Sequence, residues 1–94
     1  MNSPMRDAGA VPLVVTLYTR AGCHLCEEAK QQMAPLLAEF AAELREVDVD
    51  ADPALRELYT DDVPVIFLGE RKIAKHRVDI AQFRRQLQDT ASRR

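Results

Sequence analysis

Both cysteines of this 94-residue chain lie in one short stretch, Thr19 to Cys26, which reads TRAGCHLC. Cys23 and Cys26 are three positions apart, between an apolar run and an amphipathic one, so this spacing predicts a turn from a strand into a helix. Such a turn brings two sulfurs within disulfide reach, and the N–H groups and dipole of the helix start favour a thiolate. A disulfide across so short a loop barely constrains the unfolded chain, so a structural bridge explains the pair poorly. The residues therefore indicate redox chemistry.

Length and composition indicate one folded domain. The chain is 47% hydrophobic and 30% charged, a balance typical of globular proteins, and its length suffices for a single core. The formal net charge of -2 gives no electrostatic reason to expect nucleic acid or a membrane as a partner. We expect a flexible lead-in at 1–11, a folded domain at 12–88 and a frayed basic tail at 89–94. The start of the chain shows no signal-peptide pattern, and the paired cysteines suit a reducing compartment, so we expect a cytoplasmic protein.

Two apolar patterns enclose the cysteines. Leu13–Tyr18 is an almost continuous apolar run rich in β-branched residues, which is typical of a strand buried on both faces. From Leu25 to Phe40, apolar residues recur every three or four positions, which predicts an amphipathic helix. Pro35 lies inside this segment and has no amide hydrogen to donate, so we expect a kink or a break between 32 and 35.

The rest of the chain adds three expected strands and two expected helices. They are a half-exposed edge strand at 44–50 and a short helix at 53–60 capped by Asp52, followed by a strand at 63–68 that begins with Val63-Pro64. A Gly69-Glu70 turn then leads to a return strand at 71–75, and a final helix capped by Asp79 covers 80–88. The order β-α-β-α-β-β-α predicts an α/β fold. Its four-stranded mixed sheet should have a parallel core, an antiparallel hairpin at one edge and helices on both faces.

The cysteine motif at a helix start, the Val63-Pro64 pair at a strand start and this element order together resemble the thioredoxin fold. The similarity is greatest to its glutaredoxin-like branch and covers residues 12–88. In small glutaredoxin-like proteins a cation often precedes the first cysteine by three positions, and Arg20 occupies that place. The resemblance implies a cis peptide bond between Val63 and Pro64 that faces the sulfurs. Such a bond would present the backbone of Val63 for β-like pairing with an extended substrate.

The resemblance also implies a role for each cysteine. Cys23 would be the nucleophile and Cys26 the resolving thiol. Their expected positions agree with these roles, because Cys23 lies at the exposed end of the turn and Cys26 in the first helical turn, and a nucleophilic thiol needs exposure.

Two segments depart from the usual glutaredoxin pattern. His24-Leu25 stands between the cysteines where Pro-Tyr or a similar pair is usual. His24 would stabilise a thiolate when protonated, and the alternative is an exposed residue at the helix start. Glutathione-binding members have Gly-Gly followed by Asp after the fourth strand, whereas residues 74–79 here read AKHRVD. We therefore expect no tightly bound cofactor. If glutathione serves as the reductant, we expect it to bind in a way that differs from the family's usual mode.

The first hypothesis for function is an enzyme, a glutaredoxin-like thiol–disulfide oxidoreductase. A thiolate on Cys23 attacks a substrate disulfide, and Cys26 then displaces the reduced product from the mixed disulfide. The expected substrate is a disulfide-containing protein or a small thiol compound, and a separate reductant opens the bridge left behind, as in electron transport for cell redox homeostasis. The residues expected to contact the substrate are Arg20, His24, Val63 and Pro64.

Two further hypotheses remain open at this point. The same cysteines, with His76 or a second subunit, would be ligands for zinc or an iron–sulfur cluster. Alternatively, the chain is a non-catalytic thioredoxin-fold binding module in which the cysteines are incidental.

Overall fold

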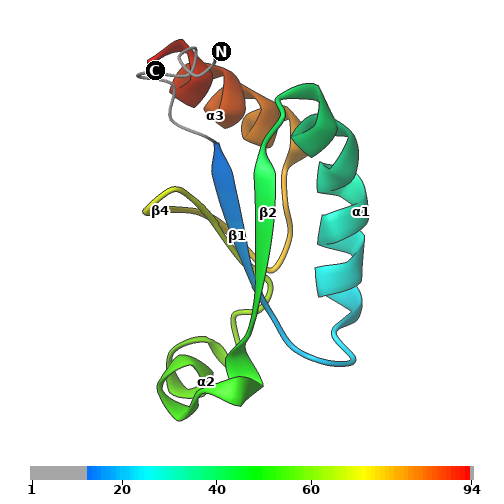
Figure 1. Cartoon of the computed structure of the whole chain (residues 1–94). Helices are drawn as coiled ribbons and strands as arrows, with labels where there is room; N and C mark the ends of the chain where they lie inside the picture. The colour runs from blue at the N-terminus through cyan, green and yellow to red at the C-terminus, as the bar shows by residue number, and fades with distance from the viewer. Residues whose placement is uncertain (1–12, 94) are drawn as a thin grey trace, which may run out of the picture.

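A four-stranded mixed sheet forms the centre of the protein in a computed structural model, which describes residues 13–93 (Figure 1). Its strands are β1 (Val14–Thr19), β2 (Glu43–Asp48), β3 (Val65–Leu68) and β4 (Arg71–Lys75). They lie in the order β2-β1-β3-β4. β1 pairs with β2 in parallel and with β3 antiparallel, and β3 and β4 form an antiparallel hairpin. The α/β fold, the mixed sheet and the element order predicted from the sequence are confirmed, while the expected lead-in at 1–11 lies outside the described residues.

Three α-helices and one 3-10 helix connect these strands, and aspartates begin most of them. The helices are α1 (His24–Glu39), η1 (Val49–Ala51), α2 (Pro53–Tyr59) and α3 (Ile80–Ser92). Asp52 accepts a hydrogen bond from the Ala54 N–H at the start of α2, and Asp79 accepts one from the Gln82 N–H at the start of α3. These are the expected N-caps. Asp48 caps η1 in the same way, so β2 ends at Asp48 and not at residue 50 as expected.

The main core lies between one face of the sheet and helices α1 and α3. We call it the apolar layer, and it contains Leu13, Val15, Leu17, Ala29, Met33, Leu36, Leu37, Ile66, Leu68, Phe83 and Leu87. Side chains alternate along a strand, so Tyr18 points to the opposite face. There its ring lies 4.9 Å from that of Tyr59 in α2, which places helices on both faces as predicted. Figure 1 shows α2 and the loop between β1 and α1 at one end of the sheet, and α3 at the other.

The helices differ from expectation at two places. No break occurs at Pro35: α1 runs through it, because Met33, Leu36 and Leu37 on either side are buried in the apolar layer while Pro35 faces solvent. α3 continues to Ser92, beyond its expected end at 88. Its last turn is held by an ion pair of 2.8 Å between Arg93 and Asp89 and by partial burial of Ala91.

Among residues 13–93, no helix combines the length and the apolar character that crossing a membrane requires.

Candidate functional site

The cysteine motif begins where β1 ends. Residues 20–22 form a turn in which Gly22 adopts a φ of 76°, a left-handed conformation that glycine takes without steric cost. The N–H of Cys23 donates to the carbonyl of Arg20 at 3.3 Å, which closes this turn, and Cys23 is the N-cap of α1. Cys23 and Cys26 are joined as a disulfide, with their Cα atoms 5.2 Å apart. The predicted strand–turn–helix setting of the pair is thus the observed one.

The two sulfurs have different surroundings. Cys23 is half-buried, whereas Cys26 has no exposed surface. The Cys26 N–H donates a hydrogen bond to the Cys23 sulfur at 3.1 Å, so this sulfur is the capping acceptor of α1. In the reduced protein the same N–H and the helix dipole favour a thiolate on Cys23 over one on Cys26. This asymmetry suits the predicted roles of nucleophile and resolving thiol.

Acidic side chains follow the cysteines in the first turns of α1, and one of them is paired. Lys30 lies 3.3 Å from Glu27 and 3.2 Å from Glu46 of β2. The hydrogen bonds that Lys30 donates to Glu27 and then to Glu46 raise the pKa of its ammonium group. Lys30 therefore stays charged and offsets the carboxylate of Glu27, which would otherwise oppose a thiolate on Cys23.

The Val63-Pro64 peptide bond is cis. Val65 pairs with Tyr18 near the end of β1, so this bond lies at the end of the sheet from which the cysteine loop leaves. Pro64 is fully buried, and its carbonyl accepts a hydrogen bond from the His76 N–H at 2.8 Å. Within residues 13–93, the backbone N–H and C=O of Val63 form no hydrogen bond with the rest of the chain. Both groups remain available for pairing with another backbone.

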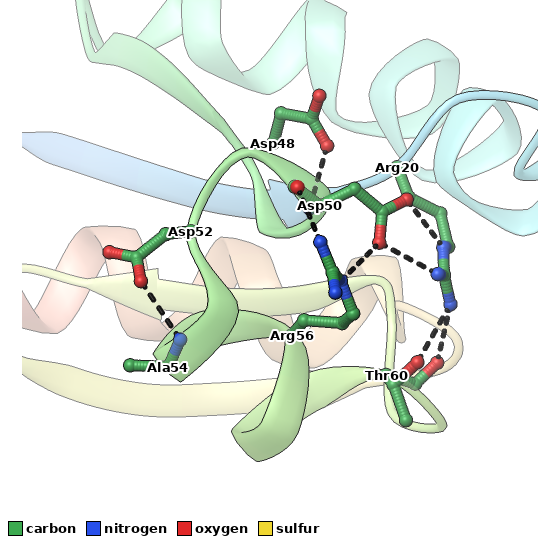
Figure 2. Close-up of polar contacts among 7 residues, drawn as sticks. All are labelled: Arg20, Asp48, Asp50, Asp52, Ala54, Arg56 and Thr60. Carbon is green, nitrogen blue, oxygen red and sulfur yellow. Dashed lines mark hydrogen bonds and ion pairs between the residues drawn. The ribbon is translucent and has the colours of Figure 1, made fainter.

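Arg20 forms four hydrogen bonds that use all three of its side-chain nitrogens (Figure 2). Nε donates to Asp50 Oδ2 at 3.1 Å and Nη2 to Asp50 Oδ1 at 2.8 Å. Nη1 donates to the carbonyl and to the hydroxyl of Thr60, each at 3.0 Å. Arg56 reaches the same aspartate, with Nη2 3.1 Å from the Asp50 carbonyl and Nε 3.5 Å from Oδ1. We call Arg20, Asp50, Arg56 and Thr60 the clamp.

The clamp connects three segments that are far apart in the sequence. Arg20 belongs to the turn before Cys23, Asp50 to η1, and Thr60 to the C-cap of α2, shortly before Val63. The resemblance placed Arg20 at the site, but the sequence did not predict that Asp50 or Thr60 would contact it. An Asp-x-Asp pattern at 48–50 is the one local signal, since Asp48 caps the short helix that presents Asp50.

His24 and the segment after β4 complete the surroundings of the cysteines. His24 is the first residue of α1 and is exposed. His76 has a φ of 70°, and its Nε2 lies 3.0 Å from the Asp61 carbonyl. Lys75 Nζ and His76 Nε2 both lie 3.8 Å from Asp62 Oδ1. These two side chains therefore hold the loop before Val63.

The described residues contain no group of three His, Cys, Asp or Glu side chains arranged to hold a metal ion. His76 in particular contacts Asp61 and Asp62. A pocket of about 590 Å³ lies along α3 and beside Arg71, at the end of the sheet opposite to Cys23. A second, smaller pocket adjoins the cysteine motif, and it is lined by Leu25, Glu28, Ala29, Gln32, His76, Arg77 and Val78.

Comparisons with solved structures agree with this fold. Protein Ne2328 from Nitrosomonas europaea, solved by NMR, is 30% identical, with a TM-score of 0.68 over 88% of this chain and 98% of that one. Mitochondrial thioredoxin 3 from Saccharomyces cerevisiae, in its oxidized form, is 16% identical with a TM-score of 0.63, over 89% of this chain and 84% of that one. The second similarity shows the thioredoxin-like fold alone.

Sequence comparisons identify the family. Uncharacterized protein Rv0508 from Mycobacterium tuberculosis is 36% identical over 70 residues, which are 69% of this chain and 72% of that protein. A protein from Dictyostelium discoideum named as a glutaredoxin-like protein YDR286C homolog is 31% identical, over 69% of this chain and 66% of that one. Residues 14–88 match the family described as Glutaredoxin-like domain (DUF836). This match covers most of the chain and all four strands, and the chain therefore belongs to the Glutaredoxin-like domain (DUF836) family.

Proposed function

We propose that this protein is a thiol–disulfide oxidoreductase that uses Cys23 and Cys26 as a dithiol. One observation carries the proposal: the half-buried sulfur of Cys23 caps α1 and accepts the N–H of the fully buried Cys26. A thiolate at this place is stabilised while it stays accessible, and its partner thiol lies within bonding distance. The family and the fold support a redox protein of this kind.

The reaction transfers two electrons from the dithiol to a substrate disulfide. The Cys23 thiolate attacks one substrate sulfur, an S–S bond forms between them, and the other substrate sulfur leaves as a thiolate that takes up a proton. Cys26 then loses its proton and attacks the Cys23 sulfur, and the second half of the substrate leaves as a thiol. The Cys23–Cys26 disulfide that remains must be opened by a separate dithiol or by two monothiols. A reducing compartment such as the cytoplasm supplies these reductants.

Val63 and Pro64 are the proposed binding surface for the substrate backbone. The N–H and C=O of Val63 have no partner within the described residues, and they lie at the same end of the sheet as Cys23. An extended peptide that contains a disulfide would pair with both groups, as in β-strand addition. His24, exposed beside Cys23, would contact the substrate from the helix side.

Single replacements of the two cysteines test the mechanism. Reduced protein is mixed with a peptide that carries one disulfide, and the reaction is quenched with an alkylating reagent and examined by mass spectrometry. Cys23→Ser should abolish reduction of the peptide, and Cys26→Ser should accumulate a covalent complex of protein and peptide. Reduction by Cys23→Ser at the wild-type rate would overturn the mechanism. Far-UV circular dichroism of both variants checks that they are folded.

A further inference from the structure

Arg20 is a cation in the turn that leads into the nucleophile. Arg20 lies three residues before Cys23, and the Cys23 N–H donates to its carbonyl, so the two residues share one tight turn. Its side chain is 31% exposed, enough for contact with a bound substrate. An arginine in this place is suited to pair with a carboxylate on an anionic disulfide, because its fork of N–H groups matches a carboxylate well.

The clamp, however, already engages every nitrogen of this fork. Asp50 accepts from Nε and Nη2, and Thr60 accepts twice from Nη1 (Figure 2). The bidentate pairing with Asp50 also compensates part of the guanidinium charge, since Asp50 Oδ1 lies 2.8 Å from Nη2, and the same carboxylate also faces Arg56 Nε at 3.5 Å. A substrate carboxylate would have to displace Asp50, which is already fixed by the hydrogen bond from its own N–H to Asp48 and by Arg56.

Other cations at this end of the sheet also lie close to a carboxylate. Lys75 and His76 lie 3.8 Å from the carboxylate of Asp62, in the loop that leads to Val63. Asp61 in the same loop is exposed. Asp62 thus serves Lys75 and His76 as Asp50 serves Arg20 and Arg56, with one carboxylate shared by two cations in each case.

We propose that Asp50 is a specificity-determining residue that withholds Arg20 from substrates, so that the dithiol reduces neutral or cationic disulfides in preference to anionic ones such as glutathione disulfide. This inference rests on the proposed function and adds the substrate class to it. The electron and proton balance is that of the reaction already described, because Asp50 and Arg20 exchange neither with the substrate.

Three small disulfides of similar length and different charge test this directly. They are bis(2-hydroxyethyl) disulfide, which is neutral, cystamine, which is a dication, and 3,3′-dithiodipropionate, which is a dianion. Pre-reduced protein is mixed with each compound, and the second-order rate of formation of the Cys23–Cys26 disulfide is measured by alkylation and mass spectrometry. The result for each variant is its ratio of dianion rate to neutral rate, relative to that of the wild type, so that general losses of activity cancel.

Asp50→Asn should raise this ratio roughly three- to tenfold, about the effect of one charge-assisted hydrogen bond, because Arg20 loses the carboxylate that compensates its charge and competes for its N–H groups. The same variant should lower the corresponding ratio for cystamine. The double variant Arg20→Gln, Asp50→Asn should lose the gain for the dianion. Higher salt should reduce the gain as well, since the new pairing is partly exposed.

Asp52→Asn is the matched control. It changes the net charge by the same amount two residues away, but Asp52 caps α2 through the Ala54 N–H and makes no contact with Arg20. Asparagine is an equally good N-cap, so the fold should be retained. The ratio should change less than twofold. Equal increases of the ratio in Asp50→Asn and Asp52→Asn would show that net charge alone causes the effect, and this would overturn the inference. An unchanged ratio in Asp50→Asn would overturn it as well.

A measurement on the wild-type protein covers the case in which Asp50→Asn does not fold. Suberate is a dianion with the same number of chain atoms as the 3,3′-dithiodipropionate probe, and it cannot be reduced. The NMR signal of the Arg20 Nε–H should not move when suberate is added at millimolar concentration, and a saturable shift would overturn the inference. If the wild type reduces neither these three disulfides nor the peptide disulfide, the proposed function fails and the inference fails with it. If it reduces the peptide but none of the three, or if Asp50→Asn leaves the ratio unchanged, the specificity role alone is overturned.

Discussion

The apolar layer and the clamp hold the same sheet by different means. In the apolar layer, α1 and α3 place Met33, Phe83 and Leu87 against the sheet with at most 2% of each exposed. At the cysteine end, α2 is only seven residues long and buries none of them. There the segments around Cys23 are joined by the hydrogen bonds of Arg20 to Asp50 and Thr60, which are partly exposed.

This difference separates global stability from the geometry of the site. Burial of apolar side chains is the dominant favourable contribution to folding, so the apolar layer should set the free energy of unfolding. Partly exposed polar contacts contribute little to that quantity but are directional, so the clamp should set the relative positions of the turn before Cys23 and the loop before Val63. The proposed substrate site lies at the less apolar end, where local opening is expected to cost less.

The largest expected effect comes from the apolar layer. Phe83→Ala removes a side chain that is 2% exposed and should lower the free energy of unfolding by about 3–5 kcal/mol. Urea unfolding followed by circular dichroism measures this. Arg85→Ala, at an exposed position of the same helix, is the control and should change stability by no more than about 0.5 kcal/mol.

The same variant also tests whether the two regions are independent. Under conditions in which Phe83→Ala remains folded, its rate of disulfide exchange should stay within about twofold of the wild type, because the clamp is intact. A tenfold loss of that rate in folded protein would show that the apolar layer positions the cysteines directly.

Removal of the clamp should have an intermediate effect on stability, and this effect should be confined to the residues near Cys23. Arg20→Met should lower the free energy of opening measured by hydrogen exchange at the Cys23 and Asp62 amides by about 1 kcal/mol. Arg84→Met is the control, because Arg84 also pairs with a carboxylate, Glu39, at 2.7 Å but connects α3 with α1 far from the site. It should leave both amides unchanged. Equal effects of the two variants would mean that the clamp has no special role at the site.

The sequence was sufficient to predict most of the fold, because the responsible signals are local. The apolar run of β1, the caps Asp52 and Asp79 and the Gly69-Glu70 turn each act within a few residues. The local rule failed at Pro35, where burial of neighbouring residues in the apolar layer outweighs the hydrogen bond that proline cannot make. Such tertiary contributions have no signature in a short window of sequence.

The site was predictable only where it is a local motif or a family feature. Cys23 and Cys26 are visible as a pair, and the cis bond before Pro64 followed from the resemblance. The clamp was not predictable, since it joins Arg20 to residues 30 and 40 positions away. The position of Arg20 alone suggested contact with substrate, whereas its partners depend on how η1 and α2 pack.

The smallest expected effect comes from an ion pair within a single strand, and it provides a comparison with the clamp, whose contacts join three segments. Glu43 and Arg45 pair at 2.8 Å within β2, and both are exposed. The hydrogen bond from Arg45, together with its charge, lowers the pKa of Glu43 below its ordinary value of 4.5. A carboxylate with a lowered pKa stabilises the folded state fully above its unfolded pKa, and this contribution is lost as the pH falls through the lowered value. Stability of the wild type should therefore exceed that of Glu43→Gln slightly at pH 7.

Urea unfolding of both proteins at pH 7 and at pH 3 measures this difference, which should shrink at the lower pH. The stabilities of the two proteins at the same pH are compared, because other carboxylates titrate in the same range in both. The exchange rates of the Cys23 and Asp62 amides should not respond to Glu43→Gln at either pH, since the pair joins residues of a single strand. An increase in the exchange rates of these amides as large as that caused by Arg20→Met would mean that the loss of any ion pair destabilises the site. The connection of three segments by the clamp would then not explain the effect of Arg20→Met.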